Sequence, residues 1–477
     1  MTHTEPTCQE VDILVLGAGL AGLRAAWGAL QQAPDSRVAV VRPGPGPSGS
    51  SFSNVNNMLG MQVCQCSHDE DALVADVKAA ALQGHVDESL VRIMARESRD
   101  RFDDLAELGI EFKTDANGDP QRFSGCFSPN SRRAVVFTRL GRIYHRFADK
   151  VTSLGGKFFT GFMVRDLLTD TDGQRVHGAL LHHAPDGRLL AVRAQAVIMA
   201  LGGSAPLFAF SQAGPQNPGF SLALLQRAGV RLVNQGFMQF MWAETQTRAF
   251  WPIQRLGLNG ALVRAQNGNE SALPDELREL AVPRAAHCPY GHGLEDARLD
   301  RYLLDRLGPK GTAQVHDPDR GWLEIAPMAH AGNGGALIDA TGATNISGLY
   351  ACGECASGMH GANRVGGAMV LATQVFGERA GRHAAARLKF SMGPSDKTIT
   401  GLVIRDSDQQ IEDDAEYRRE KHWLAWALQR CVPGYARKET GFLCNEAVRR
   451  QRTVKDWKAR LALDTGLTLL RAFAVNN

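Results

Sequence analysis

The chain has 477 residues, of which 44% are hydrophobic and 22% charged, so it can bury a large core. This composition excludes a disordered chain and a small scaffold held together by disulfides. Lys and Arg number 53 against 50 Asp and Glu, a net charge of +3, and the lack of a basic excess argues against a nucleic-acid partner. The nine cysteines are scattered along the chain, which indicates reduced thiols and a cytoplasmic location.

No segment has the pattern of a membrane span or of a targeting signal. The apolar stretch 11–30 carries Asp12, Arg24 and several glycines, and no basic region precedes it. A strand, a turn and a helix explain this stretch better than a membrane span does. We therefore expect no direct membrane insertion.

The first elements of the chain predict a complete βαβ unit. A buried-type strand at 11–16 runs into Gly17-Ala-Gly19-Leu-Ala-Gly22, and a helix and a second strand at 37–41 follow. Glycines at this spacing form a sharp turn, admit a pyrophosphate close to the backbone and let the helix pack on the strand. The positive N-terminus of the helix favours the pyrophosphate. The unit therefore predicts a dinucleotide-binding fold.

The second strand ends at Arg42-Pro43. An Asp or Glu near this position commonly holds a ribose hydroxyl of NAD. Because that acid is absent, the sequence does not favour simple use of NAD. A loop rich in Gly, Ser and Asn follows over residues 43–57.

Two helices are expected after this loop. The run Ser67-His-Asp-Glu70 has the pattern of a capping box and predicts a helix that buries Leu73, Val74, Val77 and Ala81. A second helix is predicted from Asp87 to Gly109, where glycine ends it.

Composition and pattern divide the rest of the chain into four segments. A strand at 196–201 ends in Gly202-Gly203, and a more polar stretch at 238–324 predicts an inserted domain. A second strand-turn-helix is expected at 349–386. The charged stretch beyond Gly393 is expected to be helical.

Two glycine-rich segments are the most informative motifs for the function of the chain. Residues 349–367 read Leu-Tyr-Ala-Cys-Gly-Glu354-Cys-Ala-Ser-Gly-Met-His360-Gly-Ala-Asn-Arg364-Val-Gly-Gly367, and a helix follows. Upstream, residues 326–335 read Ala-Pro-Met-Ala-His330-Ala-Gly-Asn-Gly-Gly. Together they resemble the succinate dehydrogenase, fumarate reductase and L-aspartate oxidase flavoprotein family, and the resemblance covers residues 10–392.

The resemblance implies bound FAD and hydride transfer at flavin N5. Arg364 matches the family's arginine that binds a substrate carboxylate, a task that suits its bidentate fork. His330 and His360 match residues that line the same pocket. Glu354 would hold a ribityl or ribose hydroxyl, and Gly366-Gly367 would direct N–H groups at the reduced flavin. The residues expected to bind FAD are Gly17, Gly19, Leu20, Ala21, Gly22, Arg42, Ser50, Ser51, Asn56, Asn57, Ala200, Gly202, Gly203, Gly353, Glu354, Arg364, Gly367, Ala368, Val370 and Leu371.

The start of the cap departs from the family pattern. The family has Gln-Phe-His-Pro-Thr there, whereas this chain reads Gln239-Phe240-Met241-Trp242-Ala243. The histidine and threonine that bind substrate are therefore missing. Trp242 is expected to add a flat apolar wall, which favours a monocarboxylate, an aryl acid or an amino acid over a symmetric C4 diacid.

Two further family residues are missing. The proton-donating arginine of the family aligns with Gly257, so Arg255, two residues away, is the candidate substitute and completes the expected catalytic set of His330, Arg364 and His360. The histidine that links FAD covalently in the respiratory enzymes is absent from residues 52–57. We therefore expect FAD to be held non-covalently.

Two cysteine pairs stand close in the sequence. Cys352 and Cys355 form a Cys-x-x-Cys, which can be a redox pair, but they occupy small-residue positions of the expected flavin turn. Cys64 and Cys66 have the close spacing of metal ligands, but no partner pair completes a site with them, so no metal site is expected.

The sequence thus predicts an α/β protein with a Rossmann-like FAD-binding domain (8–237 and 325–392). A small α+β capping domain (238–324) interrupts it, and a short helical C-terminal region (393–477) follows. The expected function is that of an FAD-dependent oxidoreductase acting on a small carboxylate-bearing substrate. The alternatives are L-aspartate oxidase-like amine oxidation and the role of a non-catalytic flavin subunit in electron transfer. An iron–sulfur or other redox subunit is a candidate partner.

Overall fold

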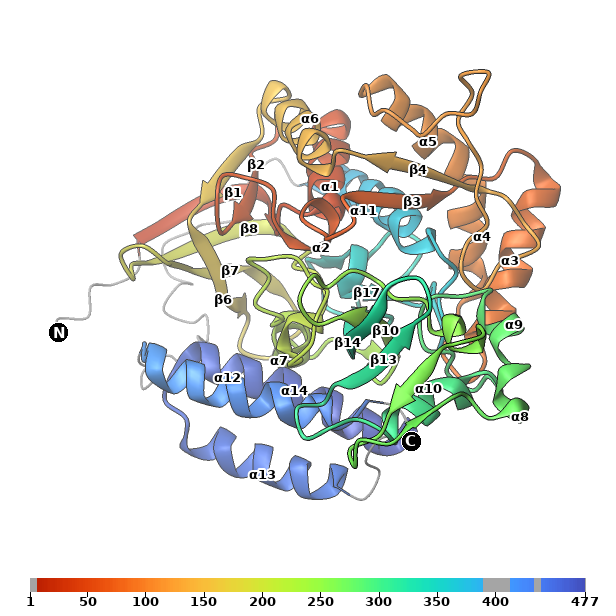
Figure 1. The fold of residues 1–477 in the computed structure, drawn as a ribbon. Coiled ribbons are helices and arrows are strands. Elements are labelled where there is room, and N and C mark those ends of the chain that lie inside the picture. Colours follow the sequence, from red (N-terminus) through yellow and green to blue (C-terminus); the bar gives the residue numbers. More distant parts are fainter. Residues whose placement is uncertain (1–6, 389–411, 433–438, 477) are drawn as a thin grey trace.

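The computed structural model describes residues 7–388, 412–432 and 439–476. Its centre is a seven-stranded sheet in the order β5-β2-β1-β8-β7-β6, with β16 paired to β8 (Figure 1). The strands β1, β2, β5, β8 and β16 are parallel, and β6 and β7 add an antiparallel edge. The strands are β1 (Thr7–Leu16), β2 (Val38–Arg42), β5 (Lys157–Thr160), β6 (Phe162–Thr169), β7 (Val176–His183), β8 (Leu189–Met199) and β16 (Leu349–Ala351).

The predicted βαβ unit is confirmed. β1 leads through the glycine turn into α1 (Leu20–Gln32), and β2 then pairs with β1 in parallel. Ile13, Leu14, Val15 and Leu16 are completely buried, because both faces of a parallel sheet are covered. The α/β class expected from the sequence is confirmed as well.

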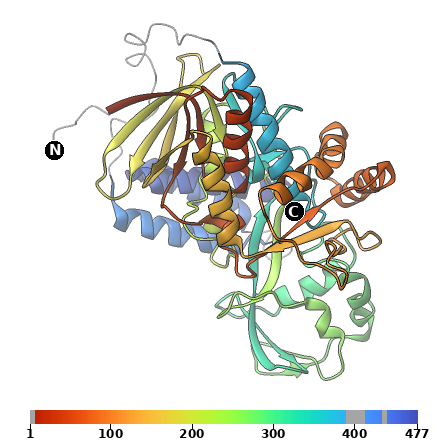
Figure 2. The same ribbon diagram turned by 90° about the horizontal axis from the view of Figure 1, so that it is seen from above.

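Helices α1 and α11 (Ala368–Ala386) lie side by side against the sheet (Figures 1 and 2). Glycine permits this close approach. A Cβ on Gly381 would lie 2.0 Å from the carbonyl oxygen of Ala25, and one on Gly377 would lie 2.8 Å from that of Ala21. The two helices therefore pack closely along each other.

The predicted helices after residue 57 differ in detail from those in the structure. α3 (Ser67–Ala81) begins one residue after its N-cap, Cys66, and no side chain caps it, so the predicted capping box is wrong. The predicted second helix is two helices, α4 (Glu88–Arg96) and α5 (Ser98–Glu107), which meet at Glu97. Asp87 caps α4 as expected from its position, since its side chain accepts the N–H of Ser89. The remaining elements of this region are α2 (Gly49–Phe52), β3 (Met58–Gln62), β4 (Ala134–Thr138) and α6 (Leu140–Ser153).

A second, five-stranded sheet has the order β10-β14-β13-β11-β12. It belongs to the part of the chain that projects from the main body in Figure 2. β14 is one continuous strand across residue 324, the predicted end of the cap, and it returns to the main body with His330 near its end. The elements are β10 (Met238–Glu244), η2 (Ile253–Gly257), β11 (Leu262–Arg264), β12 (Glu270–Ser271), α8 (Asp275–Arg278), α9 (Ala281–Arg284), α10 (Ala297–Leu304), β13 (Ala313–Asp317) and β14 (Gly321–Gly332).

A small third sheet pairs a segment before the cap with two segments after it. Its order is β17-β15-β9. The elements are η1 (Ala205–Leu207), α7 (Ser221–Arg227), β9 (Leu232–Val233), β15 (Gly335–Leu337), η3 (Gly353–Cys355) and β17 (Ala356–Ser357).

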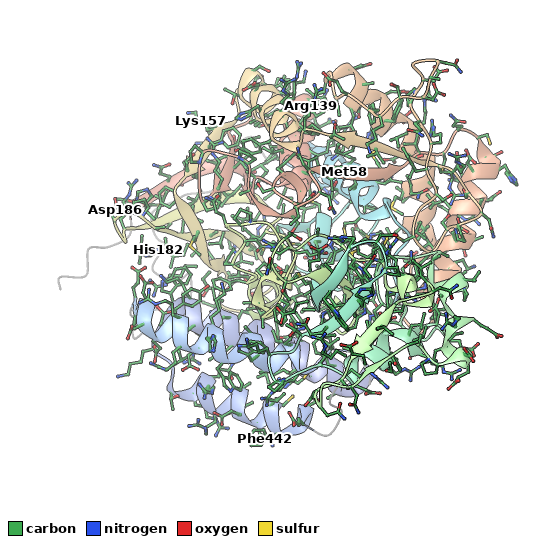
Figure 3. The ribbon with its side chains drawn as sticks, viewed as in Figure 1. Met58, Arg139, Lys157, His182, Asp186 and Phe442 are labelled. Atoms are coloured by element: carbon green, nitrogen blue, oxygen red, sulfur yellow. The ribbon has the colours of Figure 1, made fainter. Side chains whose placement is uncertain are left out.

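Three C-terminal helices lie along one side of the molecule (Figure 1). They are α12 (Asp414–Gln429), α13 (Thr440–Thr453) and α14 (Trp457–Asn476). Phe442 on α13 is 70% exposed and lies at the outer rim in Figure 3. Within the described residues, no helix is long and apolar enough to cross a membrane.

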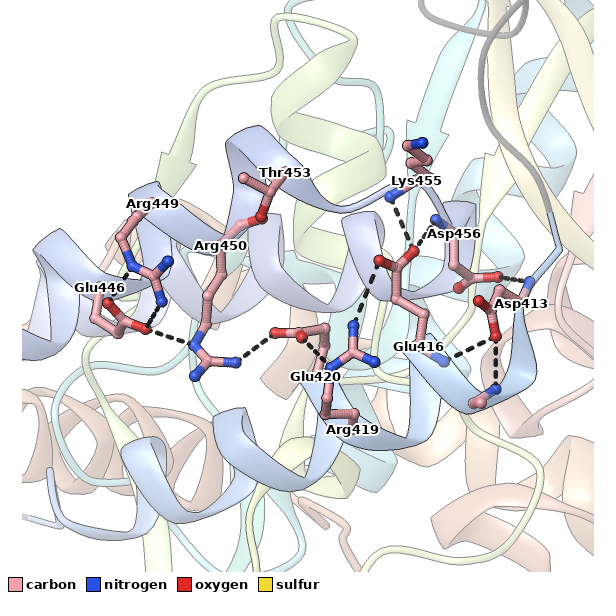
Figure 4. Close-up of polar contacts among 11 residues, drawn as sticks. Asp413, Glu416, Arg419, Glu420, Glu446, Arg449, Arg450, Thr453, Lys455 and Asp456 are labelled. Atoms are coloured by element: carbon pink, nitrogen blue, oxygen red, sulfur yellow. Dashed lines mark hydrogen bonds and ion pairs between the residues drawn. The ribbon is translucent and has the colours of Figure 1, made fainter.

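An ion network joins these helices (Figure 4). The Arg450 guanidinium contacts Glu446 of its own helix at 2.8 Å and Glu420 of α12 at 2.9 Å. The Glu416 carboxylate accepts the backbone N–H groups of Lys455 at 2.9 Å and Asp456 at 2.6 Å. α12 is thus fixed to both α13 and the turn before α14.

Candidate active site

A cavity of about 440 Å³ lies at the carboxyl ends of β1 and β8, between the main sheet and the cap. In an open α/β sheet this edge is where ligands bind. Most residues expected to bind FAD line it, together with His330. These are Gly17, Gly19, Leu20, Ala21, Ser50, Ser51, Asn56, Ala200, Gly202, Gly353, Glu354, Arg364, Gly367 and Val370.

The other residues expected to bind FAD lie outside this lining. Gly22 supports the glycine turn, and Ala368 and Leu371 are completely buried in α11. The Asn57 side chain accepts the N–H of Leu140 at 3.0 Å. Gly203 lies behind the Glu354 side chain, where a Cβ would approach Oε1 to 2.0 Å.

Arg42 is also outside the cavity lining, although Val41 and Pro43 on either side line it. Its guanidinium donates to the Tyr144 hydroxyl at 2.6 Å and to Thr160 Oγ1 at 2.8 Å. This arginine therefore joins β2 to β5 and α6.

The glycine turn has the geometry that the sequence predicts. Gly17 has a φ of +112°, and a Cβ there would lie 2.4 Å from the carbonyl oxygen of Ala200. A Cβ on Gly22 would lie 1.9 Å from the carbonyl oxygen of Gly17, whereas one on Gly19 would meet no protein atom within 4 Å. The first and third glycines thus serve packing, and the second leaves space for a ligand beside the N-terminus of α1.

A second helix N-terminus faces the same cavity. Gly367 has a φ of +81° and is the N-cap of α11. Gly366 and Gly367 both line the cavity, close to Arg364. Free N–H groups and the positive end of a long helix favour an anionic group there.

Glu354 lies in η3, directly after Gly353, and its carboxylate lines the cavity. Its Oε1 accepts the backbone N–H of Gly332 at 2.7 Å. Burial raises the pKa of Glu354, although hydrogen bonds from Gly332 and Gly203 and the charge of Arg364 oppose the increase. An acceptor in this position can hold a hydroxyl of a ribityl or ribose chain.

Arg364 presents a buried guanidinium to the cavity, and its exposed fraction is 9%. Its one recorded hydrogen bond within the described chain is a long one of 3.4 Å to Asn333 Oδ1. Burial lowers the pKa of Arg364 to about 10, and the negative charges of Glu354 and Cys126 oppose this decrease. Arg364 therefore remains protonated at neutral pH and has room for an anionic ligand.

A bulge directs His330 into the cavity. β10 and β14 pair through Gln239 with Ala331 and through Phe240 with Ala329, so His330 is the extra residue of β14. Bulges redirect side chains next to active sites. Burial, followed by the charge of Arg364, lowers the pKa of His330 to about 4, so its imidazole is neutral at pH 7.

His360 lies close to this site but outside the cavity lining. Its exposed fraction is 1%, and both ring nitrogens lack a hydrogen-bond partner within the described chain. Burial, followed by the charge of Arg364, lowers the pKa of His360 to about 3.

Arg255 is not brought to the cavity. Its Nε contacts Asp317 Oδ2 at 2.5 Å, and its Nη2 contacts Asp317 Oδ1 at 2.7 Å and Asp319 at 2.5 Å. Those contacts raise the pKa of Arg255. The residue proposed from the sequence as a proton donor is thus part of an ion pair in the cap.

The apolar wall of the cavity has a different origin from the expected one. Met241 and Phe250 line it, together with Gln239. Trp242 lies on the opposite side of β10, where its Nε1 donates to Asp300 at 2.9 Å. Side chains alternate along a strand, so Gln239 and Met241 share one face and Trp242 takes the other. The expectation that Trp242 lines the site is wrong.

Some lining residues have no signal in the sequence. Cys126, Cys288 and the segment around Asn217 line the cavity. Asn217 donates to the carbonyl oxygen of Gly203 at 3.0 Å. The two residues are far apart in the sequence, so no local motif predicts that Asn217 lies at the cavity. Across the described parts of the chain, no group of three His, Cys, Asp or Glu residues could hold a metal.

Comparison with known proteins identifies the family. Residues 12–370 match the FAD binding domain family. The chain is 32% identical to L-aspartate oxidase of Caulobacter vibrioides over 403 residues, which cover 78% of this chain and 76% of that protein. This chain belongs to that family of flavoproteins. One subunit of the fumarate reductase (CoM/CoB) of Methanothermobacter marburgensis is 28% identical to this flavoprotein over 89% of the chain and 82% of the relative.

Solved structures show the same fold. E. coli quinol fumarate reductase aligns with this flavoprotein at a TM-score of 0.74 and 20% identity, covering 98% of this chain and 88% of that one. The Mycobacterium smegmatis Sdh1 complex in its apo form aligns at 0.76 and 21%, covering 98% and 86%. The flavoprotein is therefore an FAD-dependent oxidoreductase of the succinate dehydrogenase, fumarate reductase and L-aspartate oxidase family.

Proposed function

We propose that this flavoprotein transfers a hydride between flavin N5 and a small substrate that Arg364 binds through one carboxylate. The observation that supports this most directly is the buried Arg364 guanidinium, which faces the cavity beside the N-terminus of α11. Among the described residues, Arg364 forms no ion pair with a carboxylate. A buried cation in this position is costly, and a substrate carboxylate that forms two parallel hydrogen bonds with it relieves that cost.

The other residues have supporting roles. The glycine turn at Gly17–Gly22 and the Glu354 carboxylate would bind the phosphates and a hydroxyl of FAD. When bound, FAD supplies a hydride acceptor or donor. His330 is neutral, so it can donate one hydrogen bond and accept another at the substrate without adding charge.

The cavity favours a substrate with a single carboxylate. Arg364 is the only arginine or lysine among the described residues that line it, and Met241 and Phe250 make an apolar wall. A second carboxylate would therefore meet no cation. We propose a monocarboxylate, an aryl acid or an amino acid, and poor turnover of fumarate and succinate.

Amine oxidation is the second candidate. The 32% identity to an L-aspartate oxidase supports it. In that case the substrate would be an amino acid, oxidised to an imine, with Arg364 again binding the α-carboxylate.

We also propose that an electron-transfer subunit is a partner of this flavoprotein. The fumarate reductase relative is one subunit of an enzyme with several subunits, which supports this proposal.

The test is Arg364→Ala. Losing one member of a buried charged pair typically costs about 2–5 kcal/mol, so the Kd for a carboxylate ligand, read from the flavin absorbance, should rise at least tens of times. FAD content should stay near that of the wild type. Arg142→Ala, at an exposed arginine, is the control. Loss of FAD together with ligand binding would contradict the assignment.

Anaerobic flavin reduction separates the two candidate reactions. Saturated carboxylic acids and L-amino acids are offered in turn, and the loss of flavin absorbance is measured. Bleaching by amino acids alone supports amine oxidation, and bleaching by saturated acids supports desaturation. Fumarate reduction with reduced viologen at an ordinary rate of about 1–10³ per second would contradict the single-carboxylate proposal.

We also propose that FAD is bound non-covalently, because residues 52–57 contain no histidine. After acid precipitation the yellow colour should remain in the supernatant. Colour retained in the washed pellet would show a covalent bond.

A further inference from the structure

Two thiols outside the predicted site face the same cavity. Cys126 lies in the loop before β4, and Cys288 lies in the cap loop between α9 and α10; both are half-buried and line the cavity. They are 162 residues apart in the chain, yet the Cys288 backbone N–H donates to Cys126 Sγ at 3.3 Å. The fold thus brings the Cys126 sulfur into direct contact with Cys288, where the cap meets the cofactor-binding part.

The two loops hold each other in place. The N–H of Phe127 donates to the carbonyl oxygen of Ala286 at 3.2 Å, and the Phe127 ring stacks on His287 at 4.4 Å between centroids. The N–H of Gly366 donates to the carbonyl oxygen of Cys126 at 2.9 Å. Cys126 is therefore fixed to the segment that carries Arg364.

The surroundings favour a thiolate on one member of the pair. Hydrogen bonds from the thiol and the N–H of Cys288, with the charges of His287 and Arg284, lower the pKa of Cys126. The same contact raises the pKa of Cys288. Arg364 also interacts with the charge on Cys126. A thiolate beside a protonated thiol is the arrangement of a nucleophile and a resolving cysteine.

The Cys-x-x-Cys pair of Cys352 and Cys355 has no thiol with a lowered pKa. Cys352 and Cys355 are completely buried, and burial raises the pKa of Cys355 to about 12 and also raises the pKa of Cys352. The Cys355 thiol donates to the carbonyl oxygen of Gly202 at 3.4 Å. These two cysteines are protonated packing residues.

We propose that Cys126 and Cys288 form a redox-active dithiol that exchanges with low-molecular-weight disulfides entering the cavity. This is a second chemical activity of the site, and it depends on neither the proposed substrate nor the proposed hydride transfer.

The exchange has two steps. The Cys126 thiolate attacks one sulfur of a disulfide RSSR, the S–S bond breaks, and RS⁻ leaves and takes up a proton from solvent. Cys288 then loses its proton and attacks Cys126 Sγ in the mixed disulfide, and the second RS⁻ leaves with that proton. In sum, the Cys126 thiolate, the Cys288 thiol, RSSR and one proton from solvent give the Cys126–Cys288 disulfide and two RSH, so the protein loses two electrons and one proton.

Oxidation changes the cavity in two ways. It removes the thiolate charge that faces Arg364, which leaves the guanidinium to an incoming carboxylate. It also joins the cap covalently to the loop before β4. Reduction by a small thiol reverses both changes.

The experiment uses the holoprotein and oxidised glutathione. After incubation, free thiols are blocked with N-ethylmaleimide and peptides are mapped without reduction by mass spectrometry. We expect a peptide pair linked through Cys126 and Cys288, the loss of two thiols per chain, and full reversal by dithiothreitol. A linked Cys352–Cys355 peptide, or no linked peptide while all nine thiols stay free, would overturn the proposal.

Three variants assign the roles. Cys288→Ser should retain glutathione on Cys126 as a mixed disulfide, and Cys126→Ser should give neither product. Cys66→Ser, at an exposed cysteine, should react as the wild type does. With iodoacetamide at pH 7, Cys126 should react at least about tenfold faster than Cys352 or Cys355. Equal rates, or glutathione on Cys288 in the Cys126→Ser variant, would contradict the assigned order even if the variants bind FAD poorly.

Discussion

Arg24 of α1 forms a buried ion pair with Glu378 of α11, with 2.6 Å between Nη2 and Oε2. The same Arg24 nitrogen contacts Asp104 of α5 at 2.6 Å. The exposed fractions of the Arg24 and Glu378 side chains are 1% and 7%. This pair therefore joins the two helices whose N-termini face the cavity.

Replacing Arg24 by Ala should be strongly destabilising. It removes a buried cation that contacts both Asp104 and Glu378, although Arg101 still contacts both carboxylates. Breaking a buried pair typically costs about 3–5 kcal/mol, and the remaining Arg101 contacts place the expected cost at the lower end of that range. Denaturant unfolding of the holoprotein measures the free energy. Arg37→Ala, which breaks the more exposed pair with Asp12, should cost less than about 1 kcal/mol. Equal costs would show that the buried pair has no special role.

Gly381→Ala should separate α1 from α11. The new Cβ would lie 2.0 Å from the carbonyl oxygen of Ala25, and backbone must move to admit it. We expect weaker FAD binding, measured as the fraction of protein that retains flavin after gel filtration, and a lower melting temperature. Gly441→Ala, in α13 where a Cβ meets nothing within 4 Å, should not lower either quantity. If Gly381→Ala retained full FAD at wild-type stability, the close packing would not be required.

His360 should make the protein sensitive to mild acid. The pKa of His360 is lowered to about 3 in the fold, whereas a free histidine titrates near 6.5. The unfolded chain therefore binds more protons below pH 6.5, and stability falls as the pH falls from about 6.5 towards 3. Between pH 7 and 5, His360→Gln should reduce this slope by up to about 1.4 kcal/mol per pH unit. A slope in His360→Gln equal to that of the wild type would contradict the prediction.

Arg255→Gln should affect stability rather than turnover. Asp317 is completely buried and would lose its bidentate partner, a cost of about 1–3 kcal/mol. We expect the rate of flavin reduction by substrate to change less than about twofold, a small effect beside the 10²–10⁴-fold typical of a lost proton donor. The rate is measured by stopped-flow absorbance. A fall of about a hundredfold in Arg255→Gln would show that Arg255 takes part in proton transfer after all.

Local patterns predicted much of the cofactor side. The geometry of the turn Gly17–Gly22 and of the segment around Arg364 can be predicted from consecutive residues, because steric limits and helix N-termini act over a few residues. The substrate side depends on longer-range geometry. Side chains alternate along β10, so Trp242 points away from the cavity, and a bulge in β14 directs His330 into it. Neither orientation can be predicted from composition.

The remaining features arise only when distant segments meet. The sequence draws attention to Cys352 and Cys355, yet burial raises the pKa of both thiols. Cys126 and Cys288 have no pattern in the chain, and their contact exists because two loops pack together. The ion pair of Arg255 with Asp317 is likewise a property of the folded cap, whereas the sequence near Gly257 favoured a role in proton transfer.

β14 has a mechanical consequence. The strand begins in the cap and carries His330 into the cavity at its other end, while Arg364 belongs to the segment that precedes α11. Met241 and His330 lie on the paired strands β10 and β14, whereas Arg364 lies on a different segment. A shift of these two strands would therefore move Met241 and His330 together relative to Arg364 and change the width of the gap in which a substrate must fit.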